Sequence, residues 1–168
     1  MLAPGLRAVA LTVDADDATL DEIVAKAHPR MLQLHGAESA ARVSEIKARY
    51  RLPVMKAIAI ETAADVKRAR GYEAVADILL FDAKPDALPG GNGLVFDWQL
   101  IAKEKWSKPW MLSGGLTAAN VAEAIRITHA HGVDVSSGVE KSRGEKDPAL
   151  IERFIAAARS AFAESHPK

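Results

Sequence analysis

Two short segments near the C-terminal end of the sequence combine an apolar run with a turn rich in glycine and serine. They are residues 112–116 (LSGGL) and residues 133–140 (VDVSSGVE). An apolar run that opens into such a turn is typical of a buried parallel strand whose loop binds a phosphate group. Gly114 and Gly115 would let the backbone approach an anion without a Cβ atom in between. Ser136, Ser137 and Gly138 would close the other side of the same site.

The residue after the first segment could strengthen this site. Thr117 can cap a following helix, whose first N–H groups would also point toward the anion. Each segment by itself is equally consistent with a tight turn between a strand and a helix. Because the two segments occur in consecutive strand–helix units, we interpret them together as one phosphate-binding site.

Asp82 and His35 are candidates for acid–base chemistry. Asp82 ends an apolar run, and the period of a strand places it on the same face as Ile78 and Leu80. A carboxyl group at the end of an apolar stripe could act as a general acid, although an aspartate there can also cap a helix or bond to a loop. His35 follows another apolar run, where a structural role and a chemical role are both open.

Lys56 and Asp134 also lie on predicted strands. Lys56 could form a Schiff base, as in barrel aldolases, but a lysine paired with a carboxylate of the barrel is the commoner arrangement. Asp134 lies early in its predicted strand, where it could hold neighbouring side chains in place. We expect no metal site, because the remaining histidines lack metal-ligand spacing: His28, His129, His131 and His166.

Six apolar runs alternate with helical segments along the chain. The strands are expected within residues 8–13, 31–36, 54–58, 77–82, 110–113 and 133–136. The helices are expected near residues 17–27, 43–50, 62–71, 97–102, 118–131 and 148–165. The strands are continuous apolar runs, so both faces of the sheet must be covered, and this predicts a parallel α/β fold.

The positions of the polar residues favour a barrel over a doubly wound open sheet. His35, Lys56, Asp82, Ser113 and Ser136 lie at or near the carboxyl ends of five different predicted strands. A (β/α)8 barrel gathers all such ends around one mouth, whereas an open sheet joins only the ends beside its switch point. We therefore predict a TIM-type barrel.

Composition limits the remaining possibilities. The 168 residues show no linker or compositional break and predict one domain over residues 1–168. Lys plus Arg equals Asp plus Glu at 22 each, so we expect neither nucleic acid nor a membrane surface as a partner. The sequence has no cysteine, which excludes thiolate metal sites and a cysteine nucleophile within it. It shows no signal peptide or membrane span, and we expect a cytoplasmic protein.

Five motifs, in order, resemble the phosphoribosylanthranilate isomerase family of tryptophan biosynthesis. They lie at residues 32–36 (LQLHG), 79–84 (LLFDAK), 90–98 (GGNGLVFDW), 112–121 (LSGGLTAANV) and 133–140 (VDVSSGVE). The resemblance implies a (β/α)8 barrel that carries out an Amadori rearrangement without cofactor or metal. Its substrate would be the phosphorylated sugar N-(5-phosphoribosyl)anthranilate, and its product 1-(2-carboxyphenylamino)-1-deoxyribulose 5-phosphate.

The resemblance also implies roles for particular residues. Asp82 matches the aspartate that serves as the general acid, and His35 and Asp134 match its partners in the barrel mouth. The phosphate would be held by the backbone around a set of small residues: Gly91, Gly93, Gly114, Gly115, Ser136, Ser137 and Gly138.

The sequence departs from the family pattern at its front. The family begins with a strand ending in Lys-Ile-Cys-Gly, whose cysteine is the general base, and an arginine after its second strand binds the anthranilate carboxylate. Neither stretch occurs here. The six predicted strands correspond to strands three to eight, so we expect an incomplete barrel that lacks the first two units. Its open edges would favour self-association, and without the base the chain alone would be inactive.

Two alternatives from other classes stay open. The chain could be a non-catalytic half-barrel that binds a phosphorylated sugar and assembles with a partner or with another copy. It could also be a different barrel enzyme acting on phosphorylated sugars, such as a ribulose-phosphate epimerase or a Schiff-base aldolase using Lys56.

Overall fold

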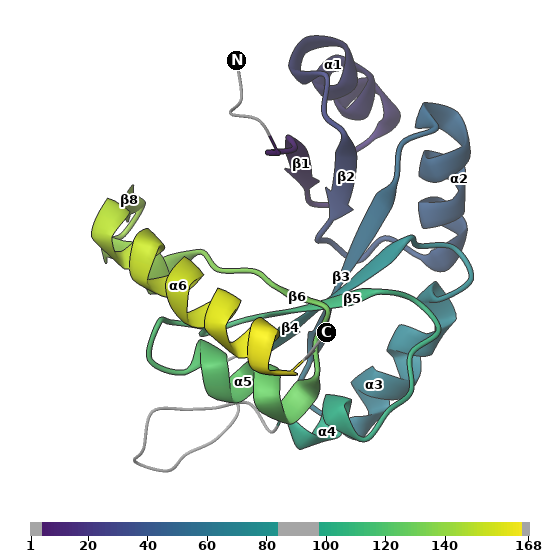
Figure 1. The fold of residues 1–168 in the computed structure, drawn as a ribbon. Helices are drawn as coiled ribbons and strands as arrows, with labels where there is room; N and C mark the ends of the chain where they lie inside the picture. Colours follow the sequence, from purple (N-terminus) through teal and green to yellow (C-terminus); the bar gives the residue numbers. More distant parts are fainter. Residues whose placement is uncertain (1–4, 84–97, 166–168) are drawn as a thin grey trace.

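Six parallel strands form one curved sheet, with helices after them in the chain (Figure 1). The computed structural model describes residues 5–83 and 98–165. The strands are β1 (Val9–Thr12), β2 (Met31–Leu34), β3 (Val54–Ile60), β4 (Ile78–Ala83), β5 (Trp110–Ser113) and β6 (Gly132–Val133). The helices are α1 (Asp17–Ala27), α2 (Ala40–Tyr50), α3 (Ala63–Ala69), α4 (Gln99–Ala102), α5 (Val121–Thr128) and α6 (Pro148–Ser165). Two short antiparallel strands, β7 (Glu140–Ser142) and β8 (Glu145–Lys146), precede α6.

The order of the strands in the sheet is the order of the chain, from β1 to β6. A doubly wound sheet reverses its strand order at a switch point, and this sheet has no reversal. Helices α1, α2 and α3 follow the outer side of the curve, and α6 packs on α5 (Figure 1). The fold is therefore an α/β half-barrel, which confirms the predicted parallel α/β class and the barrel type of winding.

Apolar side chains cover both faces of the central strands, as the continuous apolar runs predicted. The larger core lies between the sheet and the helices and includes Ile58, Leu79 and Phe81. A smaller cluster on the opposite face centres on Leu80 and packs against Ile78. Ile78 and Leu80 share a face as predicted, and the alternation continues to Asp82 at the end of β4.

Several predicted boundaries near the C-terminal end were wrong. The helix predicted over residues 118–131 is limited to Val121–Thr128, with Asn120 rather than Thr117 as its N-cap residue. The reason is a turn before the helix, in which the Thr117 N–H donates to Asn120 Oδ1 at 2.8 Å. The last strand is also shorter than predicted, because the backbone turns into a 3-10 segment at Ser137–Val139.

Two other helix ends also differ from the prediction. The helix predicted over residues 62–71 ends at Ala69 and continues as a 3-10 turn, η1 (Arg70–Tyr72). The helix predicted near residues 97–102 is seen as Gln99–Ala102, and its predicted first residue lies outside the described part of the chain.

The first strand exposes an apolar face. The side chains of Val9, Leu11 and Val13 are 43%, 57% and 61% exposed, and alternation places all three on one face of β1. In the sheet formed by the described residues, β1 and β6 are the end strands and each has a single neighbour. The curved sheet therefore has two unpaired edges.

A buried ion pair lies where β2 and β3 come together. The side chains of Lys56 and Glu38 are 2% and 3% exposed, and Lys56 Nζ lies 2.9 Å from Glu38 Oε2. The same ammonium group donates to the carbonyl oxygens of Leu34 (3.1 Å), Gly36 (2.7 Å) and Ala57 (2.9 Å). Of the two arrangements expected for Lys56, the structure therefore shows the commoner one, a lysine paired with a carboxylate.

The Glu38 carboxylate extends this network to the end of β1. It accepts hydrogen bonds from the backbone N–H groups of Asp14 (3.0 Å) and Gly36 (3.0 Å). Burial raises the pKa of Glu38, but the bonds from Lys56 and Asp14 outweigh it, so the pKa lies below its ordinary value. Lys56 lies inside β3 (Val54–Ile60) rather than at its carboxyl end as predicted, so the pair ties the interior of β3 to the carboxyl ends of β1 and β2.

Removal of one partner should destabilise the protein strongly. We expect Lys56→Met to lower the free energy of unfolding by about 3–5 kcal/mol in urea, because it leaves a buried carboxylate without its cation. The matched control is Lys26→Met, which removes a lysine from the exposed pair with Glu22 and should cost about 0.5 kcal/mol or less. Equal midpoints for the two variants would contradict the proposed weight of the buried pair.

The same pair should contribute to acid unfolding. Because the folded-state pKa of Glu38 is lowered, its stabilising contribution is present above the unfolded-state pKa of about 4.3 and is lost as the pH falls through the folded-state value. We therefore expect the double variant Lys56→Met/Glu38→Leu to lose less stability than the parent protein between about pH 5 and pH 3. Identical pH profiles would contradict this assignment.

Candidate active site

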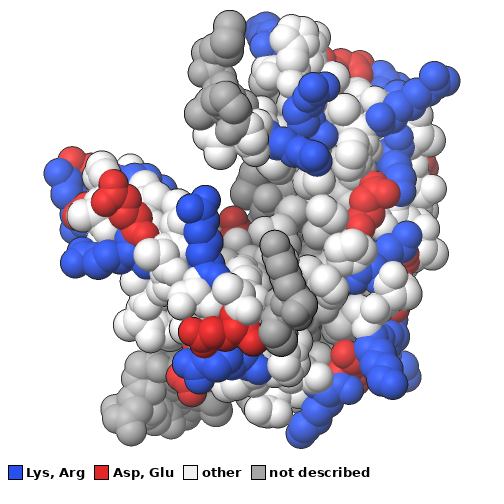
Figure 2. Space-filling model, in the orientation of Figure 1, with Lys and Arg blue, Asp and Glu red and all other residues white. Residues whose placement is uncertain are grey.

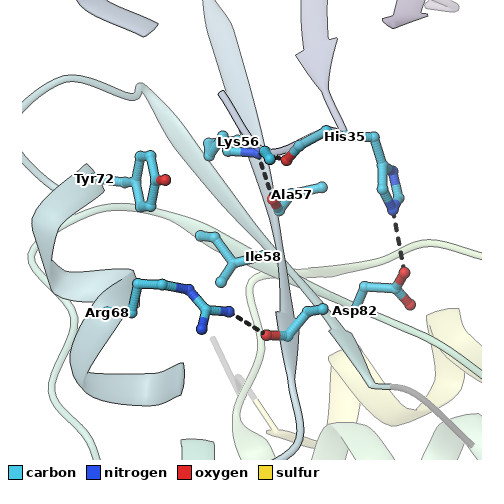
Figure 3. A pocket seen from close by; sticks show the side chains of 10 residues that line it. His35, Lys56, Ala57, Ile58, Arg68, Tyr72 and Asp82 are labelled. Atoms are coloured by element: carbon cyan, nitrogen blue, oxygen red, sulfur yellow. Dashed lines mark hydrogen bonds and ion pairs between the residues drawn. The ribbon is translucent and has the colours of Figure 1, made fainter. Parts of the chain in front are cut away.

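His35 and Asp82 meet at the carboxyl ends of β2 and β4. His35 Nε2 lies 3.1 Å from Asp82 Oδ2, and each side chain is 30% exposed. Figure 3 shows the imidazole of His35 pointing toward the Asp82 carboxylate from the neighbouring part of the sheet. The other ring nitrogen, Nδ1, lies 3.2 Å from Gln33 Nε2. The prediction that Asp82 and His35 lie at one mouth is confirmed.

Asp134 lies on the far side of the same mouth. The Ser113 hydroxyl donates to Asp134 Oδ2 at 2.9 Å, and the Asp134 N–H donates to the Leu112 carbonyl oxygen at 2.8 Å. Strand β6 ends at Val133, so the prediction that Asp134 lies early in a strand was wrong. Its contact with Ser113 does match the expectation that it holds a neighbouring side chain.

The two small-residue loops pack directly against each other. Gly114 and Gly115 have φ angles of +91° and +61°, which side chains rarely allow. A Cβ atom on Gly138 would lie 1.8 Å from the carbonyl oxygen of Leu116, so only glycine fits at this contact. The predicted neighbourhood of the two loops is confirmed. Gly91 and Gly93 lie outside the described residues.

One cavity joins these groups. It has a volume of about 380 Å3 and brings the His35–Asp82 pair, the Ser113–Asp134 pair and both loops to one space. Its remaining lining comes from the following residues: Leu11, Gln33, Gly114, Gly115, Leu116, Val135, Ser136, Ser137 and Gly138. The His35–Asp82 pair and the two small-residue loops therefore face one cavity.

A second cavity, of about 470 Å3, shares His35 and Asp82 with the first. Figure 3 shows Tyr72 and Arg68 on its opposite wall. Arg68 donates to the Ala59 carbonyl oxygen at 3.1 Å and pairs with Asp65. The His35–Asp82 pair thus separates two hollows at the mouth.

Sequence reasoning missed the role of two polar residues in the arrangement of this site. Gln33 is a buried polar residue in an otherwise apolar strand, two positions before His35 and on the same face, and this pattern could have identified it. Glu38 gave no such signal, because its partner Lys56 is remote in sequence and only the packing of β2 on β3 joins them.

Charge and metal-binding capacity do not point to a different kind of site. Acidic and basic side chains are interspersed on the face shown in Figure 2, in keeping with a net charge of zero. Within residues 5–83 and 98–165, no group of three or more His, Cys, Asp or Glu side chains could hold a metal ion. No helix in the described part of the chain is long and apolar enough to cross a membrane.

The fold and the site are those of the βα-barrel enzymes, which carry their functional groups at the carboxyl ends of the strands. The family profile described as N-(5'phosphoribosyl)anthranilate (PRA) isomerase matches residues 2–157. The chain therefore belongs to the phosphoribosylanthranilate isomerase family, whose members are isomerases of tryptophan biosynthesis. The resemblance drawn from the five motifs is confirmed.

Individual relatives agree with this assignment. The N-(5'-phosphoribosyl)anthranilate isomerase of Parvibaculum lavamentivorans is 60% identical over 158 residues, which cover 91% of this chain and 74% of the relative. The crystal structure of phosphoribosyl anthranilate isomerase from Thermotoga maritima is 32% identical, with a TM-score of 0.84, over 95% of this chain and 76% of that one. The chain spans about three quarters of the length of these relatives.

One further relative was solved as a complex with a ligand. A crystal structure of phosphoribosyl anthranilate isomerase in complex with reduced 1-(o-carboxyphenylamino)-1-deoxyribulose 5-phosphate is 30% identical to this chain, with a TM-score of 0.81. It covers 95% of this chain, and this chain covers 74% of it.

The contact between the two loops can be tested by a single methyl group. We expect Gly138→Ala to lower the free energy of unfolding by about 1–3 kcal/mol, because the new Cβ atom must displace the Leu116 carbonyl. Gly71→Ala is the matched control, since a Cβ atom there meets nothing within 4 Å. Thermal unfolding of both variants measures the difference, and an unchanged Gly138→Ala variant would contradict the close approach of the loops.

Proposed function

We propose that this chain carries the acid and the phosphate site of phosphoribosylanthranilate isomerisation, with Asp82 as the general acid. Asp82 would donate a proton to the ribose ring oxygen while the C1–O bond breaks and the anilino nitrogen forms an iminium. A base would then remove the C2 proton to give an enolamine, which tautomerises to the 1-amino-1-deoxyketose. The observation that carries this proposal is the single cavity that Asp82 shares with both small-residue loops.

The same cavity supports a position for each end of the substrate. The phosphate would lie against the backbone of Gly114, Gly115 and residues 136–138, because both glycines have positive φ angles and the space beside Gly115 is open. His35 and Asp134 would contact the opened sugar between the loops and the acid. The two side chains line this one cavity together with Asp82.

We further propose that the six units correspond to units three to eight of an eight-unit barrel. Two more strands would then pair with the open edges of β1 and β6 and cover Val9, Leu11 and Val13. The family's base is a cysteine of its first strand, and these 168 residues contain no cysteine. In such an eight-unit barrel, the base would therefore enter the mouth from one of the two additional strands.

Asp82→Asn tests the acid. In the chain joined to the first two βα units of the Parvibaculum lavamentivorans relative, we expect turnover to fall by about 10²- to 10⁴-fold, because the amide cannot deliver a proton. Binding of reduced 1-(o-carboxyphenylamino)-1-deoxyribulose 5-phosphate, measured by calorimetry, should change little.

The matched control is Asp16→Asn, because Asp16 caps α1 and asparagine is an equally good cap. It should leave turnover and binding unchanged. Unchanged turnover in the Asp82→Asn variant would remove Asp82 from the mechanism. Comparison with the chain alone, without the added units, measures what the first two units contribute.

A second candidate function is a half-barrel that binds a phosphorylated sugar and assembles with another copy. The observation that favours it is the exposed apolar face of β1, because an edge strand with exposed valine and leucine readily pairs with another chain. Such an assembly would not require that the chain turn over substrate by itself.

Self-association through β1 can be measured directly. We expect light scattering after size-exclusion chromatography to show a mass that rises with protein concentration, and Val9→Thr/Val13→Thr to lower that mass. Ile155→Thr is the control, because Ile155 is an exposed apolar residue on α6, away from the sheet edge. A single monomeric mass at every concentration would contradict association through this edge.

A further inference from the structure

We propose that Gln33 is a positioning residue that sets the tautomer of His35, and thereby keeps the acid proton of Asp82 on the carboxyl oxygen that His35 does not contact. This inference rests on the proposed role of Asp82 as the acid. It assigns a function to a residue that does not itself touch the reacting atoms.

The direction of each hydrogen bond follows from the atoms involved. An amide nitrogen can only donate, so Gln33 Nε2, 3.2 Å from His35 Nδ1, makes Nδ1 an acceptor. A neutral imidazole has one ring proton, which must then lie on Nε2. That nitrogen lies 3.1 Å from Asp82 Oδ2 and donates to it. The chain of hydrogen bonds therefore runs from Gln33 through His35 to Asp82.

This direction has a consequence for acid catalysis. A protonated Asp82 whose Oδ2 already accepts from His35 must carry its own proton on Oδ1. With the other tautomer, Nε2 of His35 would be a bare acceptor and would bind the proton that the substrate needs. Gln33 thus prevents His35 from competing with the sugar ring oxygen for that proton.

The surroundings of Gln33 support a dedicated role. Its side chain is buried, with 8% exposure, on the sheet face where Met55 and Leu80 pack. An amide in such a place loses its hydrogen bonds to water, so a polar residue there needs a specific hydrogen bond within the protein. Within the described part of the chain, the side chain of Gln33 makes this hydrogen bond to His35.

The backbone of His35 is held by other groups, so that Gln33 is left to orient the ring. The His35 N–H donates to the Thr12 carbonyl oxygen at 2.8 Å, and the Gly36 carbonyl oxygen accepts from Lys56 at 2.7 Å. These bonds fix the position of the residue, but they do not distinguish the two ring nitrogens. The contact with Gln33 does.

Nitrogen-15 NMR of the imidazole rings tests this inference without any need for turnover. In long-range proton–nitrogen spectra of the unmodified chain at mildly alkaline pH, we expect His35 as the Nε2–H tautomer. His35→Asn identifies its signals. His131 serves as an internal reference, because its Nδ1 accepts from the Trp110 N–H at 3.4 Å and should not respond to changes at position 33.

Two variants should move His35 in different ways. Gln33→Glu introduces an acceptor, so we expect His35 to gain a proton on Nδ1, whereas Gln33→Met has similar volume but no donor and should give a mixture of tautomers. In the form extended by the first two βα units, both variants should lower turnover about tenfold or more and change the binding of the reduced product analogue less than about threefold.

Each result has a distinct meaning. An Nδ1–H tautomer in the unmodified chain, or an unchanged His35 spectrum in folded Gln33→Glu, would overturn the assignment. If Gln33→Glu fails to fold, the spectra of the unmodified chain and of Gln33→Met still decide the question. If the tautomer behaves as expected while Asp82→Asn keeps full turnover, the proposed function fails and the assignment of the hydrogen bonds stands.

Discussion

The arrangement of the mouth depends on the buried ammonium group of Lys56. Its positive charge has left water almost completely, and Glu38 together with three backbone carbonyl groups replaces the lost solvation. Two of those carbonyls, at the last residue of β2 and in the loop after it, flank His35. The Glu38 carboxylate in turn accepts from the end of β1. One ion pair therefore sets the positions of the ends of β1 and β2 relative to β3, and it holds the loop from which His35 reaches Asp82 at 3.1 Å.

The opposite side of the mouth is held by close packing and by one lysine, whose Nζ donates to the carbonyl oxygen of Ser136 at 2.8 Å. There the two loops meet where Gly138 touches the Leu116 carbonyl, and left-handed glycines at positions 114 and 115 allow the chain to leave β5 at the angle this contact needs. The side near His35 is thus positioned by a buried ion pair, and the side near the glycines by steric fit together with the bond from Lys146 to Ser136. Both sides face one cavity, in which we propose that Asp82 is the acid and the loop backbone binds an anion. This division agrees with membership of the phosphoribosylanthranilate isomerase family.

Much of the fold and part of the candidate site could be predicted from local patterns in the sequence. The six strands and their parallel class follow from continuous apolar runs, and the gathering of His35 and Asp82 follows from their places at strand ends. The predicted helix and strand boundaries were wrong where a specific turn or a tertiary contact overrides the pattern of apolar residues. The helix after β5 begins at Val121 because Asn120 closes a turn on Thr117, and β6 ends early because the chain must approach Leu116 at Gly138. Hydrophobic periodicity does not predict either contact. The first is a specific turn within four residues, and the second joins two loops that are remote in sequence.

By itself, the sequence determined the class of fold, the family, and the residue types available for chemistry. The reason is that hydrophobic periodicity and strand-end motifs are local patterns, which the order of the residues alone reveals. Only the tertiary structure decided which of those residues meet. It paired Lys56 with Glu38 rather than leaving it free as a nucleophile, placed Gln33 against the histidine ring, and left the apolar face of β1 exposed. These outcomes depend on distances between strands, and a distance between strands is set by the packing of the whole sheet.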